Sequence, residues 1–349
     1  MASNIPEAVV SIMLVDAFQR PLKDLRISVT DRCNFRCTYC MPFDEYVWIA
    51  KQEILTFEEI ERLARILIGL GVERIRLTGG EPLLRKDLHR LVERLASLRG
   101  LQDLCLTTNG ALLVEQSPLL KAAGLKRINV SLDTLDPEKF KRIVKRGNLD
   151  KVLEGLFAAR SQGFHPIKIN TVVERGVNDD EIIPLVEFSR SHGFGIRFIE
   201  YMDVGNSNSW KSEKMVSKEE ILEQIRSVFP MTEVGREQGR APAVDYRFAD
   251  GGGDFGVIAS VTEPFCSGCS RARLTADGKF VTCLFSEVGH DLKTPMRVGA
   301  SDRELRERLV SIWNGRSDRY SESRLEALHS HQGYRAEDHK KIEMISLGG

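Results

Sequence analysis

Residues 25–40 read LRISVTDRCNFRCTYC, and this stretch shapes the interpretation of the whole chain. Its first residues are rich in β-formers and predict a strand over Leu25–Thr30. Cys33, Cys37 and Cys40 follow directly with a C-x3-C-x2-C spacing. Three soft thiolates on one short loop can hold three corners of an iron–sulfur cluster and leave one iron open for reaction. A zinc site with a distant fourth ligand is the alternative, and a disulfide is a third.

Short β-rich runs alternate with longer segments of helical period from Leu25 onward. Thr56 with Glu59 forms a predicted capping box, and Asn178 marks another helix start. Six runs are predicted as strands: Leu25–Thr30, Glu73–Thr78, Gln102–Thr107, Lys126–Ser131, Ile167–Val173 and Gly195–Tyr201. Alternation of this kind predicts parallel strands covered by helices. Six units without a break predict an α/β fold, namely an incomplete (β/α)6 TIM-like barrel.

The sequence changes character after Ser217, which with Glu220 marks one more helix start. Glycines then become frequent, and short strand-like runs follow at 257–261 and 279–284. The polar segment 332–341 is predicted to be mobile. We therefore expect three parts, an N-terminal extension (1–24), a barrel core (25–216) and a β-containing C-terminal region (217–349).

The composition limits the partners of the chain. Its 349 residues include 50 basic and 50 acidic side chains, so the formal net charge is zero. A neutral total argues against nucleic acid and against a charged membrane surface, although it leaves room for a local basic pocket. No run approaches the roughly 18 to 20 apolar residues of a spanning helix. The apolar stretch 8–15 lacks the preceding basic residue of a signal peptide, and seven cysteines are too few for a disulfide scaffold, so we expect a cytoplasmic protein.

A second set of three cysteines, Cys266, Cys269 and Cys283, has the spacing C-x2-C-x13-C. The zinc alternative is stronger here, because C-x2-C is a common half of a zinc knuckle. The repetition of a three-cysteine set favours two clusters that face each other across the mouth of the barrel. The remaining cysteine, Cys105, lies in an apolar strand and is predicted to be a small buried residue.

Four arginines stand in β-type runs. Arg271 and Arg273 are two residues apart and would point the same way, so they can fork onto a triphosphate or form a solvated surface pair. Arg26 and Arg76 lie in otherwise apolar runs, where an unpaired charge is costly unless an anion meets it. An exposed or ion-paired strand residue is the alternative for both.

The C-x3-C-x-aromatic-C loop after the first strand resembles the radical S-adenosylmethionine (SAM) superfamily, in which SAM chelates the fourth iron through its amino and carboxylate groups. A second matching element is the turn 78–82, TGGEP, at the end of the second β run. Alone, this turn would be an ordinary strand-to-helix loop. By resemblance, it lines the site of the SAM amino group.

Within the superfamily, the chain is similar to the GTP 3′,8-cyclase family, which begins molybdenum cofactor biosynthesis. The resemblance runs from about Arg20 to the last residue. Its marks are the first cysteine loop, the block FIEYM at 198–202, the C-x2-C-x-R-x-R motif with Cys283, and the terminal Gly-Gly. The segment 44–51 is only loosely similar.

This resemblance implies cofactors and site residues. It implies two [4Fe-4S] clusters, the first on Cys33, Cys37 and Cys40 with SAM, the second on Cys266, Cys269 and Cys283 facing the guanine of GTP. The residues implied to line the SAM pocket are Tyr39, Gly80, Ser131 and Met202. Those implied to contact GTP are Arg26, Arg76, Thr107, Lys168, Arg271, Ala272 and Arg273. Those implied to be catalytic are Arg271, Arg273, Gly348 and Gly349, the last two on a tail that reaches the active site.

The implied chemistry is radical chemistry. A 5′-deoxyadenosyl radical from SAM takes hydrogen from ribose C3′ of GTP, and the C3′ radical then attacks C8 of the purine. The bridged nucleoside radical is reduced by one electron and takes up a proton. The product is (8S)-3′,8-cyclo-7,8-dihydroguanosine 5′-triphosphate. The resemblance also implies an external electron donor and a downstream cyclic pyranopterin monophosphate synthase, and it leaves a homodimer open.

Three alternatives make different predictions. A peptide-modifying maturase of the same superfamily would carry more cysteines in its C-terminal region. A zinc-stabilised nucleic-acid-binding protein would have a basic face and many aromatic residues, whereas this chain is neutral and 7% aromatic. An iron–sulfur electron carrier would be much shorter than six strand–helix units.

Overall fold

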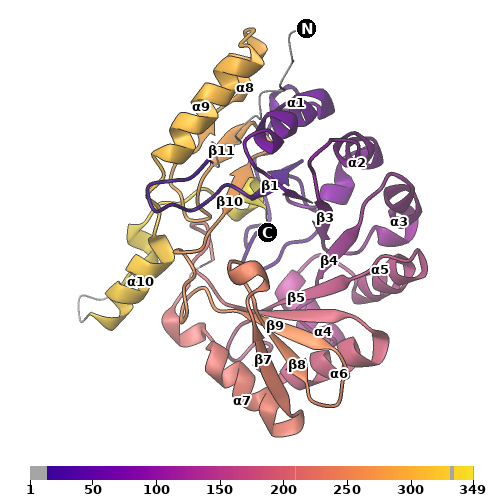
Figure 1. Cartoon of the computed structure of the whole chain (residues 1–349). Helices are drawn as coiled ribbons and strands as arrows, with labels where there is room; N and C mark the ends of the chain where they lie inside the picture. The colour runs from indigo at the N-terminus through magenta and orange to yellow at the C-terminus, as the bar shows by residue number, and fades with distance from the viewer. Residues whose placement is uncertain (1–13, 209, 331–333, 349) are drawn as a thin grey trace, which may run out of the picture.

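The structure, a computed structural model, describes residues 14–208, 210–330 and 334–348. Within these residues one 12-stranded sheet has the order β12-β11-β10-β1-β2-β3-β4-β5-β6-β9-β8-β7 (Figure 1). Its first six strands are β1 (Asp24–Ser28), β2 (Arg74–Thr78), β3 (Asp103–Thr108), β4 (Arg127–Ser131), β5 (Ile167–Val173) and β6 (Gly195–Glu200). These are the six predicted strands, each within about two residues at its ends. The α/β class is therefore as predicted.

Helices follow these strands and cover one face of the sheet, as Figure 1 shows along its outer rim. They are α1 (Phe57–Ile68), α2 (Leu88–Ala96), α3 (Leu113–Ala122), α4 (Pro137–Val144), α5 (Leu149–Ser161) and α6 (Ile182–His192). The predicted capping box opens α1, since Thr56 Oγ1 accepts from Glu59 N at 3.2 Å and Glu59 Oε2 accepts from Thr56 N at 2.8 Å. The apolar stripe of α1 then packs into the core.

The predicted helix start at Asn178 is confirmed, because Asn178 stands at the N-cap position of a 3-10 helix that leads directly into α6. Its side chain makes no cap hydrogen bond, however. Its amide donates to Asp133 O at 2.8 Å and to Val172 O at 2.9 Å, which ties two loops at the carboxyl ends of the strands together. A 3-10 turn, Asp179–Glu181, therefore comes first, and α6 starts after it.

The C-terminal region extends the same sheet at both edges. Its strands are β7 (Met231–Gly235), β8 (Val244–Phe248), β9 (Asp254–Ile258), β10 (Arg271–Leu274), β11 (Lys279–Val281) and β12 (His290–Asp291). Strand β10 pairs in parallel with β1, and β9 pairs in parallel with β6. The outer strands β12 and β7 are not paired with each other in the described residues, so the sheet stays open. The division of the chain near residues 24 and 216 remains a prediction.

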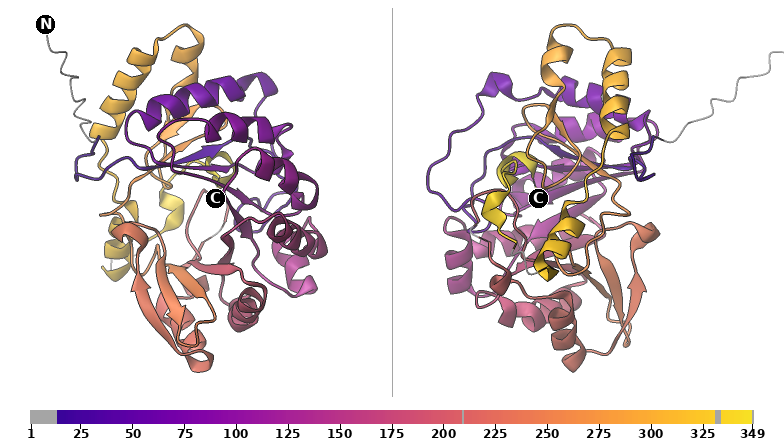
Figure 2. Two further views of the ribbon diagram at one scale, coloured as in Figure 1. Left: turned by 45° about the vertical axis from the view of Figure 1, so that its right-hand side comes forward. Right: turned by 90° about the vertical axis from the view of Figure 1, so that its left-hand side faces the viewer.

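The remaining helices lie along the C-terminal part of the chain. They are α7 (Lys218–Val228), α8 (Lys293–Arg297), α9 (Asp302–Asn314), α10 (Tyr320–His329) and α11 (Met344–Leu347). Figure 2 shows α8, α9 and α10 on the side of the sheet edge formed by β10 to β12. None of the described helices is long and apolar enough to cross a membrane.

Side chains of the parallel strands alternate between two environments. Leu25 and Ile27 of β1, like Ile75 and Leu77 of β2, are buried in the core under the helices. The residues between them point to the other face and are polar, as at Arg26 and its neighbours. The polar face of the parallel strands is therefore where a site can form.

Candidate active site

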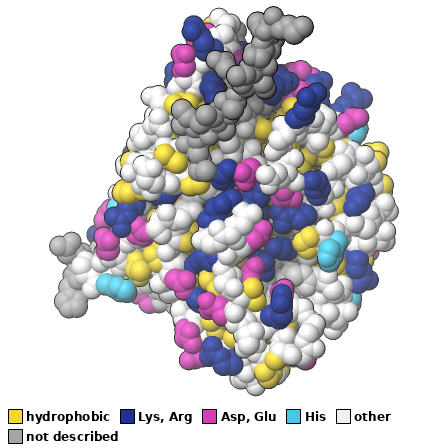
Figure 3. All heavy atoms as spheres, viewed as in Figure 1, with side chains coloured by type: hydrophobic (Ala, Val, Ile, Leu, Met, Phe, Trp, Pro, Cys, Tyr) yellow, Lys and Arg dark blue, Asp and Glu magenta, His cyan; other side chains and the backbone are white. Residues whose placement is uncertain are grey.

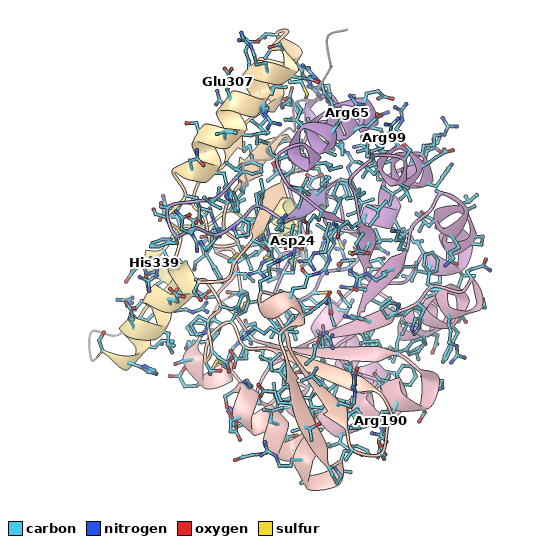
Figure 4. The ribbon with its side chains drawn as sticks, in the orientation of Figure 1. Asp24, Arg65, Arg99, Arg190, Glu307 and His339 are labelled. Carbon is cyan, nitrogen blue, oxygen red and sulfur yellow. The ribbon has the colours of Figure 1, made fainter. Side chains whose placement is uncertain are left out.

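A cavity of about 340 Å³ lies on the polar face of the sheet. Side chains of β10, β1 to β6 and β9 all line it, so the sheet curves around a single space. Figure 3 shows Lys and Arg side chains gathered near the centre of this view, and Figure 4 places Asp24, at the start of β1, in the same area. The amino ends of the strands thus face the viewer in Figure 1.

The first cysteine set lies at the opposite, carboxyl end of the strands. Its loop is fixed by the backbone of the end of α4, because Arg36 N donates to Val144 O at 3.1 Å and Thr38 N donates to Ile143 O at 2.9 Å. Arg36 also donates to Cys33 O at 2.9 Å. The loop is held mainly by main-chain contacts.

The Gly-Gly-Glu turn after β2 packs against the main chain of this loop at Arg32. A Cβ on Gly80 would lie 2.3 Å from Arg32 O, so only glycine fits there. The next residue, Glu81, donates its N–H to Arg32 O at 2.7 Å. Its buried carboxylate accepts from Thr108 Oγ1 and from Asn109 N, each at 2.7 Å. Burial raises the pKa of Glu81 to about 7.

The thiols of this first set are free, and all three cysteines are partly buried. Burial raises the pKa of Cys33 to about 11 and that of Cys40 to about 12, and it raises the pKa of Cys37 as well. Metal binding would displace the thiol protons, as soft thiolate ligation requires. The donor set therefore fits an iron–sulfur cluster.

Three of the four residues implied to line the SAM pocket lie on the cavity wall, namely Tyr39, Ser131 and Met202. The Tyr39 hydroxyl donates to Asp133 Oδ2 at 2.7 Å, which points its ring along the end of β4. Gly80 is not among the lining residues. Its observed contact is the one with the main chain of the cysteine loop.

The second cysteine set lies at the amino end of the strands. Cys266 and Cys269 precede β10, and Cys283 follows β11, which runs antiparallel to β10. All three line the cavity. The two sets therefore lie at opposite ends of the strands, rather than facing each other across one mouth. Of the first cysteine loop only Tyr39 lines the cavity, since Cys33, Cys37 and Cys40 are not among its lining residues.

Arginines surround the second set. Arg20 donates to Cys266 O and Arg316 to Cys269 O, each at 2.8 Å, and the buried Asp16 accepts from both arginines. Arg271 Nη2 lies 3.2 Å from Cys269 Sγ. Burial raises the pKa of the Cys269 thiol, but Arg271 and Arg316 outweigh burial and lower the pKa to about 7.

The predicted GTP contacts include four cations that form no ion pair with an acid within residues 14–208, 210–330 and 334–348. Arg273, Arg26 and Arg76 are register neighbours on β10, β1 and β2. Arg26 has no hydrogen-bond or ion-pair partner in the described part of the chain, Arg273 Nε is buried without one, and Arg76 contacts only Cys105 Sγ, at 3.2 Å. Lys168 also faces the cavity, and burial together with Arg197 and Arg127 lowers its pKa to about 8.

Burial and mutual repulsion both disfavour the charged form of two of these cations. Burial lowers the pKa of Arg26, and Arg273 and Arg76 lower it further. Burial, with Arg271, lowers the pKa of Arg273 to about 10. An anion in the cavity would relieve both effects, because it restores the favourable interactions of each charge.

Five further arginines line the cavity and were missed by sequence reasoning, namely Arg74, Arg127, Arg197, Arg240 and Arg316. Three of them stand on strands of the sheet, each beside an acid. Arg74 pairs with Asp24 at 2.6 Å, Arg127 pairs with Asp103, and Arg197 pairs with Asp245 at 2.9 Å. A usable signal was present, since polar residues alternate in β4 and β5 where a covered parallel strand should be apolar on both faces.

The other predicted residues take different positions. Thr107 lines the cavity, and its buried Oγ1 has no partner among the described residues. Ala272 is fully buried beside Leu25 on the core face, so only its main chain can reach a ligand. Cys105 is buried as predicted, but it points into the cavity.

The C-terminal tail enters this region. Helix α11 packs against β1, Met344 lines the cavity, and Leu347 is fully buried. A Cβ on Gly348 would lie 2.4 Å from Thr78 Cγ2 and 2.8 Å from Gly79 N, so the tail ends against the carboxyl end of β2. Gly349 lies outside the described residues.

No three His, Cys, Asp or Glu side chains within residues 14–208, 210–330 and 334–348 converge as ligands of a single metal ion. A zinc ion needs its ligands within about 2.0–2.3 Å of one point. A cluster accepts wider spacing, because its ligands bind different irons.

Comparison with known proteins defines the class. A family model described as "Radical SAM superfamily" matches residues 27–189, and one described as "Molybdenum Cofactor Synthesis C" matches residues 194–322. In fold, the chain is similar to the crystal structure of Streptococcus suis SuiB bound to S-adenosylmethionine, with a TM-score of 0.60 and 17% identity over 87% of this chain and 68% of that one. The fold and the cysteine loop thus define a radical SAM protein, as predicted.

Closer relatives define the family. The chain is 48% identical over 340 residues to "GTP 3′,8-cyclase" of Staphylococcus haemolyticus, which covers 96% of this chain and 98% of the relative. It is 46% identical over 339 residues to "GTP 3′,8-cyclase" of Aquifex aeolicus, which covers 97% and 100%. The chain belongs to the GTP 3′,8-cyclase family, which confirms the resemblance drawn from its motifs.

Proposed function

We propose that this protein converts GTP to (8S)-3′,8-cyclo-7,8-dihydroguanosine 5′-triphosphate, the first step of molybdenum cofactor biosynthesis. One observation carries the proposal. Arg26, Arg76, Arg273 and Lys168, none of them paired with an acid among the described residues, converge on a cavity that is lined by the second cysteine set and by one residue of the first cysteine loop. This arrangement suits a highly charged nucleotide held between two iron–sulfur clusters.

Each cysteine set has a distinct proposed ligand. Cys33, Cys37 and Cys40 would hold a [4Fe-4S] cluster with SAM, lined by Tyr39, Gly80, Ser131 and Met202. Cys266, Cys269 and Cys283 would hold a second [4Fe-4S] cluster. When bound and reduced, the first cluster and SAM supply the radical chemistry that starts at ribose C3′.

The protein itself binds and orients GTP. The four unpaired cations and Arg271 would hold the triphosphate, with the Ala272 main chain and Thr107 beside them. The two ends of the cavity fix which part of GTP faces which cluster. The tail carrying Gly348 and Gly349 would close the cavity and exclude water from the reacting carbons.

Other proposed partners follow from the reaction. An external electron donor must reduce the first cluster, and a cyclic pyranopterin monophosphate synthase would take the product. The seven free cysteines suit the reducing environment of the cytoplasm, where we place the reaction. A homodimer is the oligomeric state that we propose to test.

Anaerobic incubation of the reduced, iron-loaded protein with SAM and GTP tests the function. We expect 5′-deoxyadenosine and cyclised GTP in equal amounts, with about eight irons per chain if both sets hold cubane clusters. Formation of 5′-deoxyadenosine with unchanged GTP would retain the superfamily but reject this substrate. Stoichiometric zinc in place of iron would reject the proposal as a whole.

A further inference from the structure

A fully buried carboxylate, Asp203, lies one residue after Met202 in the loop that follows β6. Its Oδ1 accepts from Arg324 Nη1 of α10. Its Oδ2 accepts from the hydroxyls of Tyr320, at 2.7 Å, and Tyr334, and it lies 3.0 Å from Lys341 Nζ. The Asp203 network, as we call these five residues, therefore joins the loop after β6 to two C-terminal segments.

The network places two cations and one anion out of contact with water. The side chains of Asp203 and Arg324 are 0% exposed, and that of Lys341 is 1% exposed. Such burial strongly disfavours each charge unless the charge is paired and hydrogen-bonded. The second Arg324 amino group reaches Ser260 O, and Lys341 Nζ lies 5.4 Å from the centre of the Tyr320 ring. The sequence predicted a mobile polar segment here, and the structure corrects this for Tyr334 and Lys341.

Burial raises the pKa of Asp203, but Arg324 and Lys341 outweigh burial and lower the pKa to about 2. The carboxylate is thus ionised at any physiological pH. Its charge is the only acidic partner of Lys341 in the described part of the chain.

The C-terminal tail, by which we mean residues 341–348, begins at Lys341. Asn206, three residues after Asp203, binds the Lys341 main chain on both sides, since Asn206 Nδ2 donates to Lys341 O at 2.6 Å and Lys341 N donates to Asn206 Oδ1 at 2.9 Å. Ile342 N donates to Ser286 O at 2.9 Å. A Cβ on Gly205 would lie 2.8 Å from Glu343 Oε2, so the tail packs closely on this loop. Figure 4 labels His339 beside α10, just before this segment.

From this anchor the tail leads directly into the cavity. Met344, three residues after Lys341, lines the cavity, and Gly348 ends beside Thr78 and Gly79. The same loop after β6 carries Met202, which lines the cavity as a proposed SAM contact. The tail and the cofactor pocket therefore share one supporting loop.

We propose that Asp203 is a positioning residue that seats the C-terminal tail in the active site through Lys341, Arg324 and the two tyrosines. This inference rests on the proposed function of the tail. Asp203 touches neither substrate nor cofactor in this account, and it acts through the segment 341–348. Its loss should free the tail without removing either cysteine set.

Hydrogen–deuterium exchange on the iron-loaded protein tests this inference without reference to turnover. Asp203→Asn keeps the shape and removes the charge, so we expect exchange of the amides of residues 341–348 to rise at least tenfold over wild type. Lys341→Met, which keeps the stem of the side chain, should give the same local change. Iron content should stay at the wild-type value in both variants.

Glu181→Gln is the matched control. Glu181 is also buried and accepts from Lys139 Nζ and Leu135 N, but it does not contact the tail. In the Glu181→Gln variant we expect the amides of residues 341–348 to stay protected from exchange. In activity assays, Asp203→Asn should still form 5′-deoxyadenosine from SAM while cyclised GTP falls at least tenfold.

Two results would overturn the inference. One is wild-type protection of residues 341–348 in Lys341→Met, whether or not Asp203→Asn folds. The other is equal loss of tail protection in Glu181→Gln, which would indicate general destabilisation. If the wild-type protein cyclises no GTP, the proposed function fails, and the exchange experiment still decides whether Asp203 seats the tail.

Discussion

The two cysteine sets are held in opposite ways. The first lies at the carboxyl ends of the strands and is fixed by main-chain hydrogen bonds to α4 and by the close approach of Gly80 to Arg32. The second lies at the amino ends and is fixed by the side chains of Arg20, Arg316 and Asp16. Burial raises the thiol pKa throughout the first set and also at Cys283 of the second, whereas Arg271 and Arg316 lower the thiol pKa of Cys269.

This difference suggests a division of labour. A cluster on a loop that is held mainly by main-chain contacts can present one open iron to a small cofactor. A cluster among arginines lies next to the cations that would bind the substrate. The difference in charge between the end of the cavity near the first cysteine set and the end near the second would then set the direction in which GTP binds.

Removal of one cysteine from each set should separate the two roles most strongly. We expect Cys33→Ala to abolish formation of 5′-deoxyadenosine, because the first cluster is lost. We expect Cys266→Ala to retain formation of 5′-deoxyadenosine but to lose cyclised GTP. Each variant should keep about half of the iron. Loss of 5′-deoxyadenosine in Cys266→Ala would show that the sets do not act separately.

Substitution of a residue that holds one cysteine loop in place should affect the iron of that set alone, with a smaller effect than loss of a cysteine. Gly80→Ala places a Cβ 2.3 Å from Arg32 O, so we expect a loss of about 2–4 kcal/mol in stability and of iron from the first set only. Arg316→Met removes the donor to Cys269 O and should deplete the second set only.

Gly315→Ala is the control for the glycine change. Gly315 ends α9 with an ordinary helical φ of −78°, and its added Cβ would make normal contacts. Thermal unfolding and iron analysis of each set by spectroscopy measure these effects. Equal loss of iron from both sets in Gly80→Ala would contradict the backbone-held description of the first loop.

The smallest effect concerns pH. The pKa of Lys168 is lowered to about 8, so the side chain is charged below pH 8 and becomes neutral as pH rises through this value. The apparent affinity for GTP should therefore fall above pH 8, by up to tenfold in all. Lys168→Arg stays charged and should remove this part of the pH profile, while any titration of GTP itself remains. Identical pH profiles for both proteins would exclude Lys168 from triphosphate binding.

Local patterns predicted a large part of the molecule. The six central strands and the capping boxes at Thr56 and Ser217 depend on nearby residues, so the sequence alone reveals them. The addition of β9 and β10 to opposite edges of the sheet depends on pairing between residues far apart in the chain, for which no local pattern exists.

The sequence predicted many of the residues that line the site, but it did not predict which of their charges are paired. Sequence alone cannot show that Arg127 is neutralised by Asp103 while Arg26 has no acid beside it in the described residues. The burial of Lys341 could not be predicted from the sequence either. A lysine in a polar tail is normally exposed, and only the fold brings Asp203 to it.

Equilibrium binding of GTP tests the central claim, that unpaired cations between the two cysteine sets hold the triphosphate. The measurement compares wild type, Arg26→Gln and the double variant Asp103→Asn with Arg127→Gln, in which an ion pair is removed with no change in net charge. We predict at least about 30-fold weaker binding for Arg26→Gln, equivalent to about 2 kcal/mol, and at most about threefold for the double variant. Wild-type affinity in Arg26→Gln, or equal weakening in both, would contradict the account.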